Sequence, residues 1–315
     1  MQRQAATPSG SEWRAWTGRV LLFLGAAQII AGIFFFFAYN WDDLARWQKL
    51  GATQTGIVIC ALAARFAGLE SPAGKVLLLG AGALVGVALA VYGQIYQTGA
   101  DTFDLFAAWA GLILGWVLIA RFAAFWIFWA VIVNVALAFY LDTFTEVDEA
   151  GQLLLFGLLN AGFLLSHEVA RQRFQWLAHP WSRRVLMAAC LLLLAVAVAT
   201  VVVELRAERW LVRSVGPLSY LAVPAYLAVA LSAYLWSSGK GRDLIGLFLV
   251  VLSACGVAWY AGMEVADELF DDEGVLFLVM AGLTLAIFGP AGLWLHRTWL
   301  RLEATKGAGR GASHV

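Results

Sequence analysis

The chain has 315 residues, of which 62% are hydrophobic and 13% are charged, and its mean hydropathy is +0.79. Soluble domains carry about 25% charged residues, so this composition excludes an ordinary soluble protein and indicates an integral membrane protein. The formal net charge is zero, which argues against nucleic acid as a partner, because nucleic-acid-binding surfaces are strongly basic.

Apolar runs of membrane-crossing length follow one another along the whole chain. A spanning helix needs about 20 apolar residues to cross a hydrocarbon core of about 30 Å. Ten segments meet or approach that length: residues 17–39, 50–69, 75–97, 102–120, 122–141, 150–167, 184–204, 217–236, 243–263 and 273–296. The first run exceeds the apolar core of a signal peptide, so we expect it to remain as a span. The sequence therefore predicts an all-α polytopic transmembrane helix bundle of ten spans.

Only Arg121 separates the fourth run from the fifth. One uninterrupted helix over both runs would overshoot the bilayer, so we expect a tight turn with Arg121 at the headgroups. The spans then divide the chain into a cytoplasmic N-terminal tail (1–16), an N-terminal five-helix region (17–141), a C-terminal five-helix region (142–296) and a basic cytoplasmic tail (297–315).

Basic residues fix the orientation, since cytoplasmic loops carry an excess of Lys and Arg. With both termini in the cytoplasm, every Lys and Arg falls on the cytoplasmic side except Arg46, Lys49, Arg206, Arg209 and Arg213. Every Asp and Glu falls outside except Glu12, Glu70, Glu168, Asp243 and Glu303. The outer face is therefore expected to be acidic. The loop 205–216 resists this rule, and its side of the membrane stays open.

The first outer loop, residues 41–50, has the spacing of a short interfacial helix. Trp41, Leu44 and Trp47 recur every third residue, and Asp42 precedes Arg46 by four, the favourable order for a helical ion pair. We expect a surface helix here, with a structural role favoured over ligand binding.

Several residues inside the spans predict packing contacts and bends. Small residues let helices approach closely in lipid, which predicts packing faces at two glycine pairs, Gly82 with Gly86 and Gly111 with Gly115. Proline inside a span predicts a kink, at Pro224 in the eighth and at Gly289–Pro290 in the tenth. The amides within spans are expected to join helices by hydrogen bonds; they are Gln28, Gln54, Asn134 and Asn160.

The sequence carries no recognisable catalytic, cofactor or metal motif. It has no Gly-x-Ser-x-Gly, His-Glu-x-x-His, phosphate-binding glycine loop or Cys-x-x-Cys. Its three cysteines lie in apolar runs, and its four histidines lack metal-ligand spacing. His167 and Glu168 are adjacent, but neighbouring residues point about 100° apart on a helix, so they make a poor proton-transfer pair. We expect no cofactor and no metal, and a non-enzymatic role is favoured.

The densest group of polar side chains surrounds the end of the third span. Gln94 and Gln97 share one helix face, Tyr92 and Tyr96 share another, and Asp101 precedes Asp104 by three. Helix capping explains the carboxylates, and interfacial anchoring explains the tyrosines. Neither explains the glutamine pair. The candidate ligand-binding site therefore comprises Asn40, Trp41, Tyr92, Gln94, Tyr96, Gln97, Asp101 and Asp104.

The same positions carry a resemblance to a known family. The string Phe37-Ala38-Tyr39-Asn40-Trp41-Asp42 and the later string Gly93-Gln94-Ile95-Tyr96-Gln97 with Asp101, Leu105-Phe106 and Trp109 resemble the signature of domain-of-unknown-function family 2157. The resemblance covers roughly the first 140 residues. It implies an uncharacterised multi-pass protein of the bacterial inner membrane and no particular activity. It also implies that Asn40, Trp41, Gln94, Tyr96, Gln97 and Asp101 are signature positions.

Two functions remain in view. The first is a non-enzymatic membrane protein that binds a lipid or an envelope membrane-protein partner through its polar, acidic outer face, in addition to the bilayer around it. The alternative is a transporter of a small neutral or cationic solute, in which the glutamines and tyrosines bind the solute and the kinked spans move. The absence of a charged group near the middle of any span favours the first, because ion-coupled carriers usually keep such groups there.

Overall fold

The computed structural model describes residues 43–177, 180–208, 216–239, 243–270 and 272–311, together with a few positions between 13 and 35. Over these residues the protein is all-helical, and nine helices are long and apolar enough to cross a membrane. The helices are α2 (Arg46–Ala67), α3 (Pro72–Tyr96), α4 (Thr102–Ala120), α5 (Ala123–Phe144), α6 (Glu149–Ala170), α7 (Pro180–Glu208), α8 (Ala222–Ser238), α9 (Leu244–Leu269) and α10 (Glu273–Gly311). Two short 3-10 helices, η1 (Gln175–Leu177) and η2 (Ser219–Leu221), complete the described elements.

The predicted fold class is confirmed, since each of the nine described helices corresponds to one predicted span. The first predicted span, 17–39, lies largely outside the described residues. The turn expected at Arg121 is present: α4 ends at Ala120, Arg121 adopts a left-handed conformation with φ 46°, and α5 begins at Ala123. The tail predicted from residue 297 is helical as far as Gly311, in continuation of α10.

Two expectations from the sequence are wrong. No separate surface helix forms over the described part of 41–50, because α2 begins at Arg46 and runs on through Leu50 and Gly51 into the span. The apolar run continues after Leu50 without a helix breaker, so one helix is the simpler solution. Pro224 does not interrupt a helix, since α8 begins at Ala222. The first turn has no intrahelical acceptors for its N–H groups, so proline is tolerated there.

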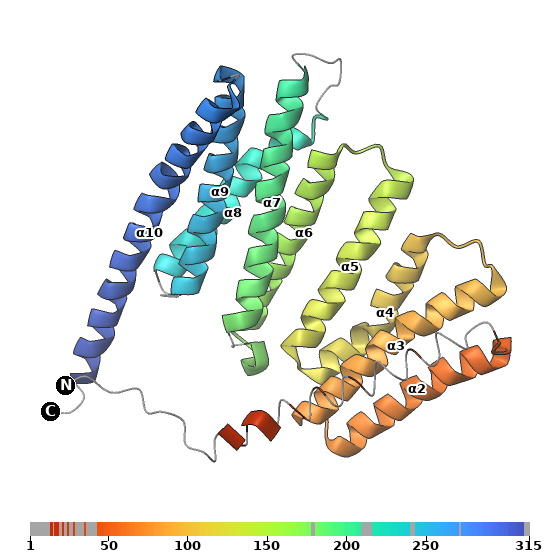
Figure 1. Cartoon of the computed structure of the whole chain (residues 1–315). Coiled ribbons are helices and arrows are strands. Elements are labelled where there is room, and N and C mark those ends of the chain that lie inside the picture. Colours follow the sequence, from red (N-terminus) through yellow and green to blue (C-terminus); the bar gives the residue numbers. More distant parts are fainter. Residues whose placement is uncertain are drawn as a thin grey trace.

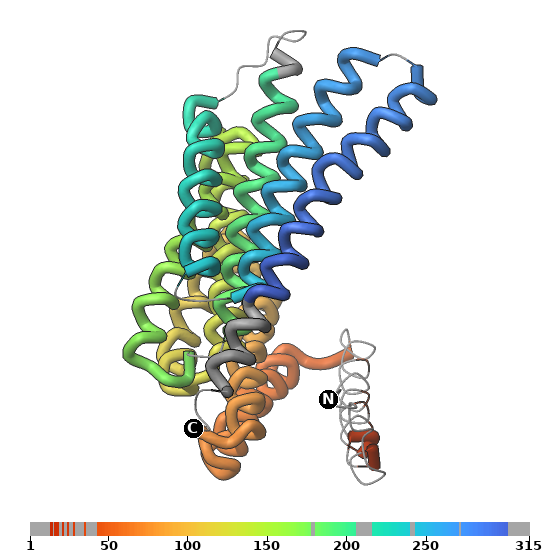
Figure 2. Tube along the Cα trace, turned by 90° about the vertical axis from the view of Figure 1, so that its left-hand side faces the viewer, coloured from red at the N-terminus to blue at the C-terminus, as the bar shows by residue number. Residues whose placement is uncertain are grey.

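Helices α2 to α7 follow one another in a curved row that α9 and α10 continue, and α8 packs beside α6, α7 and α9 (Figure 1). Each helix from α2 to α7 packs against the next, α7 contacts both α8 and α9, and α10 packs along α9. The hairpin of α2 and α3 lies aslant the other helices in both views (Figure 2). One apolar cluster is built from α2 to α5 around Ile113 and Phe125, and another from α6 to α9 around Leu154 and Leu194.

Tryptophan indoles and glycines hold the first cluster together. Trp109 on α4 donates from Nε1 to the carbonyl of Gly82 on α3 (2.8 Å), and Trp129 on α5 donates to the carbonyl of Ala110 on α4 (2.9 Å). A side chain at Gly86 would collide with the Trp109 ring, whereas Gly111 faces open space. The predicted glycine face of α3 is therefore a real packing surface, and that of α4 is not.

The amides of α5 and α6 join their helices, as predicted. Asn160 donates from Nδ2 to Asn134 Oδ1 (2.7 Å), and each side chain also donates to a carbonyl one turn earlier on its own helix. Gln54 is exposed on α2 and forms no hydrogen bond with the described residues. The polar groups between α5 and α6 therefore satisfy one another inside an apolar region.

Charge is segregated between the two ends of the row. The connections α3–α4, α5–α6 and α9–α10 lie along one end of the row, and the connections α2–α3, α4–α5, α6–α7 and α8–α9 lie along the other (Figure 1). We call the first the acidic end; its carboxylates are those of Asp101, Asp104, Asp142, Glu146, Asp148, Glu149, Glu264, Asp267, Glu268, Asp272 and Glu273. We call the second the basic end; its cationic groups are those of Arg65, Lys75, Arg121, Arg171, Arg173, Arg183 and Arg184.

Candidate functional site: the α3–α4 turn and the opposite end

The polar residues singled out in the sequence cluster where α3 ends and α4 begins. Tyr92 and Tyr96 lie one turn apart with ring centroids 4.6 Å apart and ring planes tilted by 42°, and each is about half exposed. Gln94 is exposed on the same last turns of α3. Gln97 ends the helix in a left-handed conformation with φ 43°, which turns the chain away from the α3 axis. This geometry presents aromatic and amide groups together at the acidic end.

The two aspartates begin α4, as the capping interpretation predicts. Asp101 is the N-cap residue, and its backbone N–H donates to Asp104 Oδ2 (3.2 Å). The Asp104 N–H bonds back to the Asp101 carbonyl (3.0 Å). A carboxylate in the first turn also interacts favourably with the helix dipole. Local structure therefore accounts for both residues, and both remain exposed.

No such local explanation covers the glutamines. The side-chain amides of Gln94 and Gln97 form no hydrogen bond with the described residues, and both side chains are exposed. Asn40 and Trp41 lie outside the described residues. The structure therefore brings six of the eight candidate residues to one turn, with their amide groups left unused by the fold.

Polar residues also form a cluster at the basic end, which the sequence does not predict. Asp243, directly before α9, accepts from Arg183 Nη2 (2.5 Å) and from Arg184 Nη2 (2.8 Å) on the first turns of α7. Side-chain exposure is 3% for Arg183 and 5% for Asp243. A buried arginine needs a charged partner of this kind, since an unpaired charge in an apolar region is strongly destabilising.

Three further side chains complete this network. Glu168, near the end of α6, pairs with Arg171 (2.9 Å) and lies 3.7 Å from Arg183 Nε. The guanidinium of Arg183 lies over the ring of Trp236 on α8, 3.4 Å from its centroid, and that of Arg171 lies 5.0 Å from the same ring. Cation–π contacts of this kind strengthen when they are shielded from water. The network joins the ends of α6, α7, α8 and α9.

Burial by itself raises the pKa of the Asp243 carboxyl group. Hydrogen bonds from Arg184 and Arg183 outweigh this effect, so the pKa lies below its ordinary value of 3.8. Asp243 is therefore ionised at neutral pH, which is the state that the two arginines require.

His167 and Glu168 engage different partners, as their angular separation on α6 predicts. His167 is buried and forms a hydrogen bond through Nε2 with Ser182 Oγ (2.9 Å), whereas Glu168 faces the arginines. Among the described residues, no three His, Cys, Asp or Glu side chains are close enough to share a metal ion.

The sequence alone does not predict the network at the basic end, because its charged residues lie on separate spans and each also fits an ordinary loop position. Arg183 and Asp243 are 60 positions apart, and no spacing rule links residues on separate spans. One signal was available: Asp243 is one of few carboxylates on the side that the positive-inside rule assigns to arginines.

The comparisons with known proteins address only the N-terminal part of the chain. No curated protein and no solved structure matched the sequence. Residues 1–126 match the model of the family described as "Predicted membrane protein (DUF2157)". That segment contains the signature positions and the whole α3–α4 turn, so the resemblance seen in the sequence is confirmed, and the protein is an integral membrane protein whose N-terminal portion matches this family.

Proposed function

We propose that the protein is a non-enzymatic, multi-pass component of the bacterial inner membrane that binds an envelope membrane protein through its acidic end. The observation that carries this proposal is the α3–α4 turn, where two tyrosines in ring contact and two glutamines without side-chain hydrogen bonds are exposed at one edge of the helix row. Tyrosine is enriched among the residues that dominate binding energy at protein interfaces.

Charge segregation supports the orientation. By the positive-inside rule we propose that the arginine-rich end faces the cytoplasm, with both termini on that side and the α3–α4 turn outside. The connections that share the acidic end with this turn carry a large excess of carboxylates. An acidic surface favours partners with basic loops, and its charge speeds their association.

A protein partner fits this end better than a phospholipid does. Anionic headgroups would be repelled by the carboxylates from Asp101 to Glu273, since like charges that face each other across an interface are destabilising. The bilayer nevertheless surrounds the spans, and a bound lipid is one outcome of the test below.

The transporter alternative depends on a helix that can bend. Pro290 lies inside α10, which continues through it. Because proline has no N–H, the carbonyl one turn earlier loses its helix hydrogen bond, which favours a hinge in that helix. Pro224 offers no second hinge because it lies in the first turn of α8. Transport of a small neutral or cationic solute into proteoliposomes that stops in Gln94→Ala would favour this function.

The test uses the Gln94→Leu/Gln97→Leu double variant, purified from native membranes in mild detergent and analysed by intact-complex mass spectrometry. We expect the protein to fold but to lose an associated membrane protein, because the amides are exposed and make no internal hydrogen bonds. Gln54→Leu is the matched control, since Gln54 is also exposed but lies on α2 away from the turn. It should keep the partner.

Retention of the same partner by the double variant would contradict the proposal. If the species lost is a lipid, the site is real but its occupant differs from the one proposed here.

A further inference from the structure

Helices α9 and α10 form an antiparallel pair that packs along much of its length (Figure 1). Trp259 on α9 donates from Nε1 to Thr284 Oγ1 on α10 (2.9 Å), and a side chain at Gly262 would collide with Leu283. These contacts close the upper part of the helix pair. Between them and the arginine-rich end, the two helices line two hollows.

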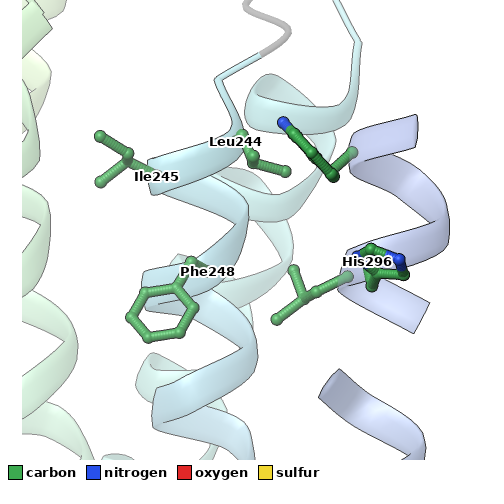
Figure 3. Close-up of a pocket in the computed structure, with 6 residues that line it drawn as sticks. Leu244, Ile245, Phe248 and His296 are labelled. Atoms are coloured by element: carbon green, nitrogen blue, oxygen red, sulfur yellow. The ribbon is translucent and has the colours of Figure 1, made fainter. Parts of the chain in front are cut away.

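The first of these is an apolar hollow of about 320 Å³ near the basic end. Figure 3 shows Leu244 and Phe248 of α9 on one side and His296 of α10 on the other. The ring of His296 lies 5.7 Å from that of Trp299, another lining residue. Trp and His side chains suit the level of the lipid headgroups, where an apolar ring meets a polar phase.

A second hollow of about 500 Å³ lies at a deeper level between α7, α9 and α10. Its walls include Ala188 and Ala195 of α7, Leu252 and Gly256 of α9, and Phe288 of α10. Ala188 is about 12 Å along α7 from Pro180, at a rise of 1.5 Å per residue, so this hollow lies within the hydrocarbon layer. Its volume is typical of ligand sites, which enclose about 300 to 1,000 Å³.

Arg184 lies one turn below this hollow on the same face of α7, since it precedes the lining residue Ala188 by four. Its side chain is 28% exposed. Nε and Nη2 donate to Asp243, at 3.2 Å and 2.8 Å, whereas Nη1 donates to no described residue. The fold thus fixes one edge of the guanidinium and leaves Nη1 without a described partner, on a residue one helical turn from the hollow.

We propose that the α7–α9–α10 hollow binds one anionic glycerophospholipid from the arginine-rich leaflet, with an acyl chain in the deep part and its phosphate at Arg184. The depth of the hollow in the bilayer favours an acyl chain as its occupant, because lipid hydrocarbon surrounds the protein at this level. Charge determines the headgroup, since a cationic side chain one turn from the hollow selects an anionic lipid. Asp243 orients the guanidinium, as charge-assisted hydrogen bonds do.

The main test fills the hollow. Gly256 lines it, and a Cβ at this position would meet nothing within 4 Å, so Gly256→Leu directs a side chain into the hollow from an uncrowded backbone position. The matched control is Gly80→Leu on α3, where a Cβ also has open space. Each protein is incubated in mild detergent with equal amounts of phosphatidylglycerol and phosphatidylcholine, and retained lipids are counted by intact-complex mass spectrometry.

We expect the unmodified protein and Gly80→Leu to retain one phosphatidylglycerol and Gly256→Leu to lose it. Arg184→Gln should reduce the preference for phosphatidylglycerol about fivefold, the effect expected of one basic side chain at a membrane surface, and Arg184→Lys should restore most of it. Equal lipid retention by Gly256→Leu, or equal retention of the two lipids by the unmodified protein, would overturn the proposal and indicate ordinary boundary lipid only.

Arg184→Gln also weakens the contact with Asp243, so its melting temperature is measured alongside. Gly256→Leu is independent of that contact and decides the outcome if Arg184→Gln is unstable. None of these variants alters the α3–α4 turn, so failure here leaves the proposed partner binding untouched.

Discussion

Asp243 links the start of α9 to the first turns of α7 through hydrogen bonds with Arg183 and Arg184. Its carboxylate accepts hydrogen bonds from two arginines, one of which is almost fully buried over the Trp236 ring. Removing the carboxylate would leave Arg183 buried without a charged partner. The exposed pairs of Glu70 with Lys75 and Arg121 are a natural contrast, because water screens them.

Asp243→Asn should therefore lower the free energy of unfolding by about 3 to 5 kcal/mol, the range for breaking a buried ion pair. Glu70→Gln, the matched control, should cost about 0 to 1 kcal/mol. Unfolding in mixed micelles, followed by tryptophan fluorescence, measures both. Equal effects of the two substitutions on the free energy of unfolding would show that the buried network stabilises the protein no more than an exposed ion pair does.

The same comparison has a defined pH dependence. Because the pKa of Asp243 is lowered in the folded protein, its ionised form stabilises the fold at neutral pH, and this contribution is lost as the pH falls below the ordinary value of 3.8. The difference in stability between the unmodified protein and Asp243→Asn should be constant from neutral pH to about pH 5 and should shrink below pH 4. A difference that vanishes already at pH 6 would contradict this assignment.

At the scale of helices, the glycines of α3 lie on a packed face, whereas those of α4 lie on an open one. Gly82 and Gly86 on α3 admit the rings of Phe125 and Trp109, whereas a Cβ added at Gly111 on α4 would meet nothing within 4 Å. Their sequence patterns are alike, four residues apart in both helices. Only the three-dimensional arrangement distinguishes them.

Gly86→Ala should destabilise the protein by about 1 to 3 kcal/mol, the cost of overpacking a filled core. Gly111→Ala should be neutral or slightly stabilising, because alanine favours a helix over glycine by about 1 kcal/mol. Melting temperatures of the two purified variants in one detergent provide the comparison. The packing interpretation fails if Gly111→Ala is the more damaging of the two.

Hydropathy and capping chemistry were sufficient to predict the described helices. Apolar run length located nine spans, Arg121 marked the α4–α5 turn, and Asp101 marked the start of α4. The sequence failed where distant parts of the chain meet. No local pattern pairs Arg183 with Asp243, and none predicts the hollow between α7, α9 and α10, because side-chain contacts between spans depend on the rotation and tilt of whole helices.

At the scale of the whole molecule, the helices form a row in which the charged groups of each connection face one of two ends. The candidate turn at the end of α3 and the arginine network lie at opposite ends (Figure 1). The proposed orientation places the first outside the cell and the second in the cytoplasm. Chemical labelling can test this directly.

Thr98→Cys and Arg173→Cys place a thiol at an exposed position on opposite ends of the row. A membrane-impermeant maleimide should label Thr98→Cys in spheroplasts and Arg173→Cys only after the membrane is permeabilised. The native residues Cys60, Cys190 and Cys255 lie within spans and serve as the unlabelled background. The reverse pattern would remove the outer site and the orientation together.

The distance in sequence between Arg183 and Asp243 also constrains how the protein is made. The two residues are 60 positions apart, and at about 5 to 20 residues per second a ribosome needs about 3 to 12 seconds to synthesise the chain between them. Throughout that delay the start of α7 has no carboxylate from α9 to neutralise it. During this time Arg183 and Arg184 remain solvated by water and lipid headgroups. The C-terminal helices can therefore complete their packing only after α9 has emerged from the translocation machinery.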